Sequence, residues 1–486
     1  MGHTCSFLVL LAILILQSLF GRSQGTNLQK PIEYSLKSDI FLFNGKAPFW
    51  ITTNQYSTVP NAKNFAFSTR ASLKADYQRD SSNKFRHFIG WGAHILPVLN
   101  IGDTTALLLP EGFLKLRMGS FEIWAGRRRE VYGLLGDTLL SAGSFAWSGN
   151  AFPMPKIQLN TTGFVDVPGT RSLLAFNASF SHGLLGNMPV VYGGRGIKSI
   201  VGYLHQKTFY LKIGKPHWRL HFWGGFNHQA QWGGENQIWP HGLPPQEAWW
   251  AVVSGKPWEG SRVGNHIGTI DVGFQWKLNT GTLFFYRQNI YDDGSLYTFL
   301  NIKDGLNGIS FQNQRPQNNL STFHLNKVVL EYMNSYDQGG DVFDFVTGVF
   351  GRDNYINHYV YKQGWSYQGQ GIGTPFIASQ EAIKKVYPRS DKQFTNNNRV
   401  KALHVAAMGN YGDWNWLLKT SYSLNFGIYD VPFSDTPRQF SGLIQIQKPL
   451  SWLKGLSWTT TFSIDRGSLF DSATGLQVGL CKSGNF

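Results

Sequence analysis

The sequence predicts an all-β protein, a transmembrane antiparallel β-barrel of about 18 strands whose long extracellular loops partly close the lumen. Three observations predict this fold. Apolar and polar side chains alternate over stretches longer than most strands of soluble proteins. The mean hydropathy of the 486 residues is -0.22, and the one long apolar run is too short to cross a membrane as a helix. Short and long connections alternate along much of the chain, as they do in bacterial barrels.

The apolar run, residues 7–20, is interpreted as part of a secretory signal peptide over residues 1–23, which leaves residues 24–486 for the barrel. Gly21-Arg22-Ser23 is a suitable cleavage site because its outer residues are small. Cys5 would be removed with this peptide. The exported chain would then keep Cys481 alone, so we expect no internal disulfide.

The chain is basic, with a formal net charge of +15. An exported protein rarely meets nucleic acid, so we do not expect nucleic acid as a partner. Anionic lipopolysaccharide or an acidic surface polysaccharide is the expected counter-charge. The alternative is that these basic side chains simply lie in the lumen or at the lipid headgroups.

The clearest strand is 413–428, in which one face is apolar and the other polar. The apolar face is interrupted by Thr420 and the polar face by Leu417. A membrane strand needs about 9–11 residues and carries aromatic residues where it meets the membrane surface. One face is therefore expected to contact lipid. Its residues are Trp414, Trp416, Leu418, Tyr422, Leu424, Phe426 and Ile428.

The same alternation predicts the other strands in chain order. In the N-terminal half they are 34–43, 67–78, 85–97, 112–118, 121–129, 170–182, 197–213 and 218–230. In the C-terminal half they are 266–278, 282–291, 323–335, 341–350, 400–410, 440–448, 456–465 and 476–486. Pro155–Thr161 is added as a short strand, because without it the alternation of connections fails once.

Connection lengths predict the orientation, since periplasmic turns are short and extracellular loops are long. The tight connections lie near 80–83, 119–120, 214–217, 279–281, 410–413 and 449–455. The long connections lie near 231–262, 292–321 and 352–397. This arrangement puts the terminal Phe486 on the periplasmic side. A terminal aromatic resembles the signal read by the barrel-assembly machinery, which we expect as a partner.

Three consecutive arginines, Arg127, Arg128 and Arg129, begin the glycine-rich segment 127–160 near an extracellular rim. Guanidinium groups form paired hydrogen bonds with the carboxylates and phosphates of acidic sugars, so these arginines are candidate polysaccharide-binding residues. The alternative is that the segment is a loop that folds into the barrel mouth.

This segment contains GR at 126–127, VYGLLGDTLLSAG at 131–143, SGNA at 148–151 and PMPKIQL at 153–159. It resembles the Wzi family of capsule-assembly proteins. NQY at 54–56, SHG at 181–183 and LEYMNSYDQGG at 330–340 look like further blocks of that family. The resemblance implies an outer-membrane barrel of 18 strands that binds exported capsular polysaccharide at the cell surface. Some members carry a periplasmic helical segment, and no amphipathic helix is evident near this N-terminus.

A second candidate surface is the loop 231–262, which holds five of the 17 tryptophans. Sugar rings lie against indole faces, and their hydroxyls need polar partners nearby. The candidate binding residues are Trp232, Trp239, Trp249, Trp250 and Trp258, with His241, Gln246 and Glu247 as possible hydrogen-bond partners. The alternative is that these tryptophans pack the loop into a lid or join the interfacial girdle.

Catalytic motifs are poorly represented, so no catalytic residue, metal ligand or cofactor is expected. The sequence has no HExxH, GxSxG or Walker motif and no cysteine-pair metal spacing. Ser181 and His182 are an adjacent serine–histidine pair, but neighbours in a strand face opposite sides. The segment 377–387 is predicted to be a short helix in an extracellular loop, with Ser379 as its N-cap and an i,i+4 pair of Glu381 and Lys385.

We therefore expect a monomeric, non-enzymatic outer-membrane barrel that assembles or retains capsular or other surface polysaccharide in a lectin-like way. Outer-membrane lipid and lipopolysaccharide are the other expected contacts. Two alternatives stay open. One is a porin-like channel that passes a solute through an open lumen, and the other is an enzyme acting on esters or peptides at the rim.

Overall fold

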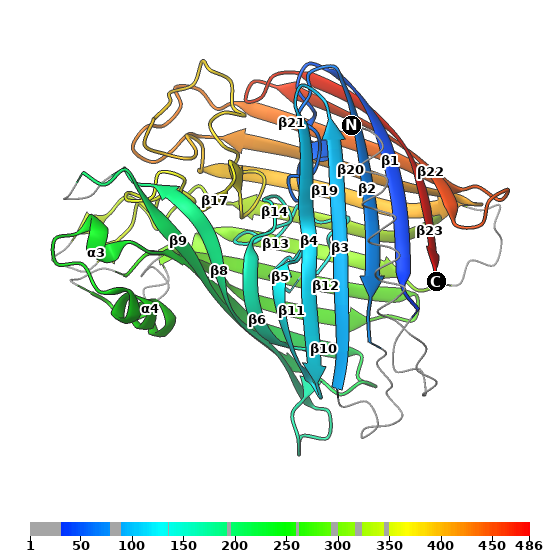
Figure 1. Ribbon diagram of the computed structural model, residues 1–486, viewed down its shortest axis with the longest axis horizontal. Coiled ribbons are helices and arrows are strands. Elements are labelled where there is room, and N and C mark those ends of the chain that lie inside the picture. Colours follow the sequence, from blue (N-terminus) through cyan, green and yellow to red (C-terminus); the bar gives the residue numbers. More distant parts are fainter. Residues whose placement is uncertain are drawn as a thin grey trace, which may run out of the picture.

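The computed structural model describes residues 31–77, 89–134, 136–191, 196–258, 262–292, 300–315, 323–344 and 349–486. The signal peptide expected at 1–23 lies outside these residues. Within them, eighteen antiparallel strands pair in chain order, and the first pairs with the last, so the sheet closes into a barrel (Figure 1). The strands are β1 (Glu33–Asn44), β2 (Phe65–Ala75), β3 (Ile89–Ile101), β4 (Thr105–Met118), β5 (Phe121–Arg127), β6 (Pro155–Thr161), β8 (Leu174–Pro189), β9 (Ser199–Ile213), β10 (Leu220–Trp232), β11 (Asn265–Lys277), β12 (Gly281–Asp292), β13 (Gly305–Asn313), β14 (Phe323–Asn334), β19 (Val400–Tyr411), β20 (Trp414–Asn425), β21 (Arg438–Pro449), β22 (Leu456–Gly467) and β23 (Ala473–Asn485).

Both ends of the described chain lie on one side of the barrel. The amide of Phe486 donates to the carbonyl of Ile32 at 2.9 Å, and the Phe486 ring lies 4.7 Å from that of Tyr34. The long connections 45–64, 128–154, 233–264 and 335–399 lie at the other end. We take this end as extracellular, in agreement with the orientation that the sequence predicts.

The strand count agrees with the prediction, although one predicted strand is wrong and one strand of the barrel was not predicted. Within the predicted strand 341–350, the described residues of β15 (Phe343–Asp344) and β16 (Val349–Phe350) pair with each other outside the barrel sheet. The strand β13 occupies part of the predicted loop 292–321 instead. Gly305, Asn307 and Asn313 share its outer face with only two apolar residues, Ile309 and Phe311, so its alternation is weak. The two errors cancel in the count.

The predicted separation of faces is confirmed on β20. Lys419 and Ser421 point inward and are buried, whereas Leu418 and Tyr422 point outward and are exposed. Leu417, which interrupts the polar face, packs inside the lumen against the buried Leu140 of the segment 128–154. The exception in the sequence pattern therefore marks a contact with material inside the barrel.

Exposed aromatic residues gather at the periplasmic end of the wall. Trp414 is the first residue of β20 and Trp458 the third residue of β22, and their rings lie 5.9 Å apart. Trp276, the residue before the last of β11, pairs with Leu220, and Trp218 precedes β10. All four tryptophans are partly or fully exposed. Such a girdle is typical of the membrane interface, which supports a lipid-facing outer wall.

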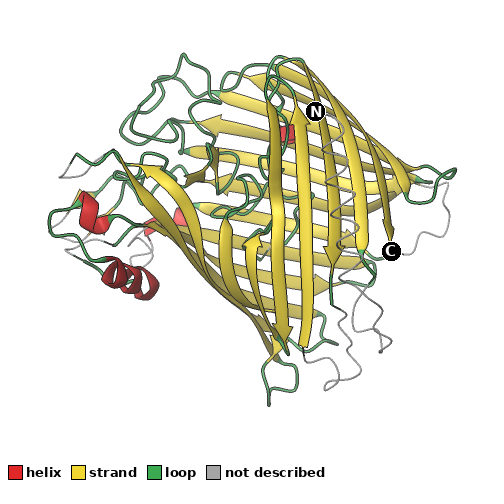
Figure 2. Cartoon of the chain, in the orientation of Figure 1, coloured by secondary structure: helices red, strands yellow, loops and turns green. Residues whose placement is uncertain are grey.

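The extracellular half of the lumen is filled by the connections that the barrel encloses. Figure 2 shows these loops inside the ring of strands. They bring a continuous apolar core into the barrel, built around α2 (Phe49–Thr52), the segment 128–154 and the loop 335–399. A buried carboxylate of β14, Glu331, holds this plug to the wall: it accepts from the Ser141 hydroxyl and the Ala142 amide, each at 2.7 Å.

The predicted helix at 377–387 is wrong, because the chain forms successive turns there. An isolated helix of this length is marginal in water. Ile383 and Tyr387 are buried against Phe433 instead, and Glu381 pairs with Arg389 at 3.2 Å. Among the described residues, no helix is long and apolar enough to cross a membrane.

Candidate functional site

The arginine cluster predicted at 127–129 lies where β5 ends against the barrel wall, and two of its members pair with carboxylates of that wall. The Arg128 guanidinium lies 2.9 Å from Glu122, and that of Arg129 lies 2.7 Å from Glu111. Burial disfavours the charged form of Arg128, but Glu130 and Glu122 outweigh this and raise its pKa. These arginines therefore already neutralise carboxylates of their own chain.

The third arginine, Arg127, is also engaged. Its guanidinium donates to the carbonyl of Pro153 at 2.7 Å and lies over the Phe152 ring. Arg127 pairs across the sheet with Gly112, halfway along β4, so it sits well below the tip of that strand. The contacts of all three arginines join the segment 128–154 to the wall. Their binding of polysaccharide stays a prediction.

Three of the sequence blocks behind the family resemblance, at 54–56, 131–143 and 330–340, contact one another at the plug. Asn54, from the NQY block, donates to the carbonyl of Ala142 at 2.9 Å. Glu331, from the LEYMNSYDQGG block, binds the neighbouring Ser141 and Ala142. His404 of β19 contacts the carbonyl of Leu140 at 2.7 Å. These contacts hold the plug in place.

The five predicted tryptophans do not form one surface. Trp232 is buried at the end of β10, and its ring lies 5.1 Å from that of Tyr203 on the outer wall. Trp249 and Trp250 lie on α4 (Pro245–Ser254). Only Trp239 and Trp258 line a common cavity, which is open to the extracellular side.

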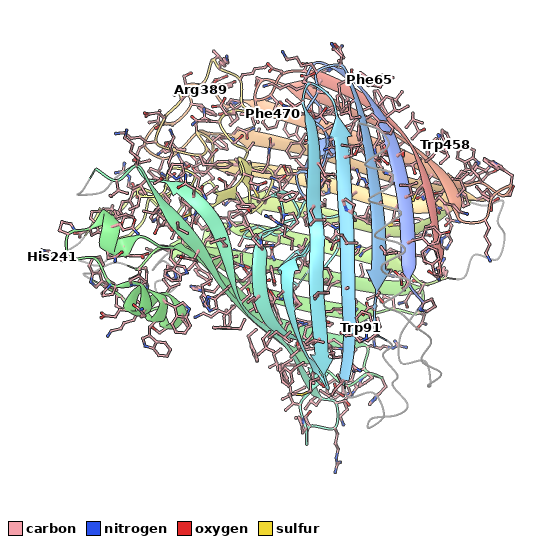
Figure 3. The ribbon with its side chains drawn as sticks, in the orientation of Figure 1. Phe65, Trp91, His241, Arg389, Trp458 and Phe470 are labelled. Carbon is pink, nitrogen blue, oxygen red and sulfur yellow. The ribbon has the colours of Figure 1, made fainter. Side chains whose placement is uncertain are left out.

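This extracellular pocket has a volume of about 270 Å³ and lies between two loops that are distant in sequence. One side is formed by α3 (Glu235–Ile238) and the residues that follow it. The other side is formed by residues 358–361 of the loop 335–399. His241 lies at the extracellular tip of the first loop, at the opposite end of the molecule from Trp458 (Figure 3). The polar and aromatic lining residues are Glu235, Trp239, His241, Trp258, Arg262, His358, Tyr359 and Tyr361.

Burial shifts the pKa values of two titratable groups of the pocket, each towards its neutral form. Burial lowers the pKa of His358 to about 3, and its Nδ1 accepts the amides of Val360 and Tyr361, each at 3.2 Å. Burial also raises the pKa of Glu235, although the Gly233 amide donates to its carboxylate at 2.8 Å. Arg262 adds a positive charge. Hydrogen-bonding groups beside aromatic rings suit a hydroxyl-rich ligand.

Residues 358–361 were missed by the sequence analysis. Their sequence, HYVY, places a histidine and two tyrosines within four positions of a loop. The ring of His358 stacks on that of Tyr361 at 4.9 Å and lies 4.7 Å from that of Tyr359. Such a dense aromatic group outside any strand is a signal that could have found this half of the pocket.

A second cavity, of about 450 Å³, lies in the periplasmic half of the lumen. Its roof is the plug segment 130–134, and its walls carry amides and hydroxyls of strands β6 to β14. The plug therefore separates this cavity from the extracellular pocket. In the described part of the chain, no cluster of histidine, cysteine or acidic residues could hold a metal ion.

Ser181 and His182 lie on opposite faces of β8, as expected for neighbours in a strand. Ser181 faces inward, is buried and donates to Gln206 at 3.4 Å. His182 shares the outward face with the exposed Phe180, and their rings lie 5.1 Å apart. This pair does not assemble a nucleophile and its base.

A closed ring of eighteen strands with an apolar outer wall, an aromatic girdle and a plugged polar lumen defines an outer-membrane β-barrel. The sequence matches the family described as Capsule assembly protein Wzi over residues 51–477, and the chain belongs to that family. The resemblance stated from the sequence blocks is therefore confirmed.

The chain is similar in structure to Wzi of Escherichia coli, which is described as an outer-membrane protein involved in group 1 capsule assembly and a carbohydrate-binding β-barrel. The identity is 13%, the TM-score is 0.55, and the match covers 93% of this chain and 85% of that one. OccAB4 of Acinetobacter baumannii matches at 12% identity with a TM-score of 0.47, over 95% of this chain and 100% of that one. OccK5 (OpdH) of Pseudomonas aeruginosa matches at 11% identity with a TM-score of 0.46, over 93% and 98% of the two chains. No curated protein matches the sequence.

Proposed function

We propose that this barrel retains capsular or related surface polysaccharide at the outer face of the outer membrane, by binding without catalysis. The observation that carries the proposal is the extracellular pocket, where Trp239 and Trp258 lie beside hydrogen-bonding side chains. The description of the Escherichia coli relative as a carbohydrate-binding barrel supports the same class of ligand. The protein acts as a monomer, depends on the barrel-assembly machinery for insertion, and contacts lipopolysaccharide through its outer wall.

The size of the pocket fits this role. A cavity of about 270 Å³ admits a short part of a glycan and not a folded partner. Each stacked aromatic contributes about 0.5–1.5 kcal/mol beyond simple burial, so one pocket binds its ligand weakly. A long polymer engages many barrels on one cell, and this multivalency converts weak single contacts into firm retention.

The test is to replace Trp239 and Trp258 with alanine and to measure cell-associated against shed polysaccharide, with the surface level of the barrel as a control. We expect more shed polymer at an unchanged barrel level. The matched control is Trp249→Ala with Trp250→Ala, which leaves the pocket lining intact. Retention lost only in this control would move binding to α4. Unchanged retention in both double variants would contradict binding by this loop.

The second candidate is a channel that uses the periplasmic cavity as a vestibule. The plug core, in which Leu140 and Phe145 are fully buried, favours a closed lumen. Single-channel conductance in planar bilayers separates the two functions. The retention function predicts little current, whereas a solute channel gives large and stable steps.

A further inference from the structure

The helix α4 lies against the outside of the barrel wall (Figure 1). Ala230 and Trp232 continue the outward face of β10, whose lower members Phe222 and Phe226 are exposed. Ala230 and Trp232 are buried because α4 covers them with one face, formed by Ala248, Ala251 and Val252. The extracellular loop therefore turns back over the rim and descends along the outer surface.

A second contact fixes the end of the helix to the same wall. The ammonium of Lys207, on the outward face of β9, donates to the carbonyl of Val253 at 2.7 Å. Lysine at a helix C-terminus satisfies a carbonyl that has no partner within the helix. The helix is thus held along one face by packing and at one end by a charged hydrogen bond.

The outer surface of the wall near α4 carries polar side chains, which are unfavourable in contact with lipid. His205, His228 and His266 belong to the outward faces of β9, β10 and β11, and His205 has no exposed surface at all. The ring nitrogens of His228 and His266 lie 2.9 Å apart. Polar groups that face hydrocarbon are costly. By lying on this side of the wall, α4 shields these imidazoles from lipid. This shielding favours the packed position of the helix.

The depth of α4 follows from strand geometry. The periplasmic girdle on β10 and β11 is marked by Leu220 and Trp276, which pair with each other. From Leu220 to Ala230, about ten residues at ~3.3 Å each and a tilt of ~40° rise about 25 Å along the barrel axis. This is the height of the apolar band. Since α4 packs on Ala230, it lies at the outer-leaflet boundary of the membrane.

The surface of α4 that does not pack on Ala230 and Trp232 carries two aromatic residues. Trp249 and Trp250 are 37% and 60% exposed, with their rings 6.0 Å apart. The ring of Trp249 lies 5.6 Å from that of His182, which contacts the exposed Phe180. The tryptophan pair is therefore continuous with the lipid-facing wall. Indole rings prefer this interfacial depth, where one edge meets water and the ring meets acyl chains.

We propose that α4 is an interfacial membrane helix, whose Trp249 and Trp250 insert among the headgroups of the outer leaflet. Because α4 follows α3, which forms one side of the extracellular pocket, this anchor holds the pocket close to the lipid surface. The anchor is independent of polysaccharide binding. In this proposal, the two most exposed tryptophans of the loop 233–264 contact lipid.

The test uses nitroxide labels at single cysteines in a Cys481→Ser background, with the folded barrel reconstituted in lipopolysaccharide-containing liposomes. Collision with oxygen, which is enriched in lipid, is compared with collision with a water-soluble nickel complex. Trp250→Cys is the test position. Phe209→Cys on the lipid-facing wall and Val386→Cys in the exposed loop 335–399 are the controls.

We expect the oxygen-to-nickel ratio at position 250 to exceed that at position 386 several-fold and to approach that at position 209. A label at Trp249→Cys should give the same result, which guards against a local effect of one substitution. A ratio at both helix positions equal to that at 386 would overturn the proposal. So would a large fall in collisions with both reagents on adding purified polysaccharide, because the tryptophans would then face the polymer.

Discussion

A single side chain of the barrel wall, Glu331, holds the segment 128–154 in its position inside the lumen. Its carboxylate accepts from Ser141, Ala142 and the Tyr286 hydroxyl, the last at 2.6 Å. Glu331→Ala would leave three buried donors without their acceptor, so we expect a loss of about 3 kcal/mol in the stability of the plug. Glu331→Gln keeps one acceptor oxygen and should lose less. Hydrogen exchange of residues 138–146 measures the effect. Equal protection in wild type and Glu331→Ala would contradict this role.

His358 makes the pocket sensitive to acid. The ordinary histidine pKa is about 6.5, and burial lowers that of His358 to about 3. Between these values the unfolded loop binds a proton and the folded loop does not. The stability from this group is therefore complete above about pH 6.5 and is lost as the pH falls towards 3.

We expect hydrogen-exchange protection of residues 354–365, corrected for intrinsic rates, to be lower at pH 4 than at pH 7. His358→Asn supplies an acceptor that does not titrate, so its protection should change much less. Protection in the wild type that is independent of pH would show that His358 does not couple the loop to acid.

At the level of single elements, the strand β13 gives a direct test of the barrel faces. Ile309 points to lipid, and the next residue, Ser310, lines the periplasmic cavity at nearly the same depth. Ile309→Arg should cost about 2–4 kcal/mol because a charge near the membrane midplane is unfavourable. Ser310→Arg reaches a polar cavity and should cost much less. Folded fractions on heat-modifiability gels report both, and equal losses would contradict the assigned faces.

Sequence periodicity predicts strands well where one face contacts lipid, as on β20. It predicts less well where contacts between distant segments determine the local conformation. The predicted strand 341–350 alternates clearly in sequence, yet its described strand residues pair outside the barrel. By contrast, β13 alternates weakly but completes the ring. The segment 377–387 has helical features, yet Ile383 and Tyr387 find more burial as turns against Phe433. In each case contacts with residues distant in sequence outweigh the local pattern.

For the whole molecule, the site was only partly predictable. The sequence identified the tryptophan loop, but not that α3 and residues 358–361 enclose Trp239 and Trp258, because no local pattern records which loops meet. It also grouped Trp249 and Trp250 with the other tryptophans, although the structure puts them on the outer wall. The three arginines look available in the sequence, whereas Glu111, Glu122 and the Pro153 carbonyl engage them in the fold.

The most direct test of the account is the binding of purified surface polysaccharide from the producing strain to the folded barrel, measured by sedimentation. The comparison is between wild type and the Trp239→Ala, Trp258→Ala double variant. We predict that the wild type binds and that the double variant binds roughly tenfold more weakly, since two stacked aromatics together contribute about 1–3 kcal/mol. Equal affinity of the two proteins, or no binding by the wild type, would contradict the central claim.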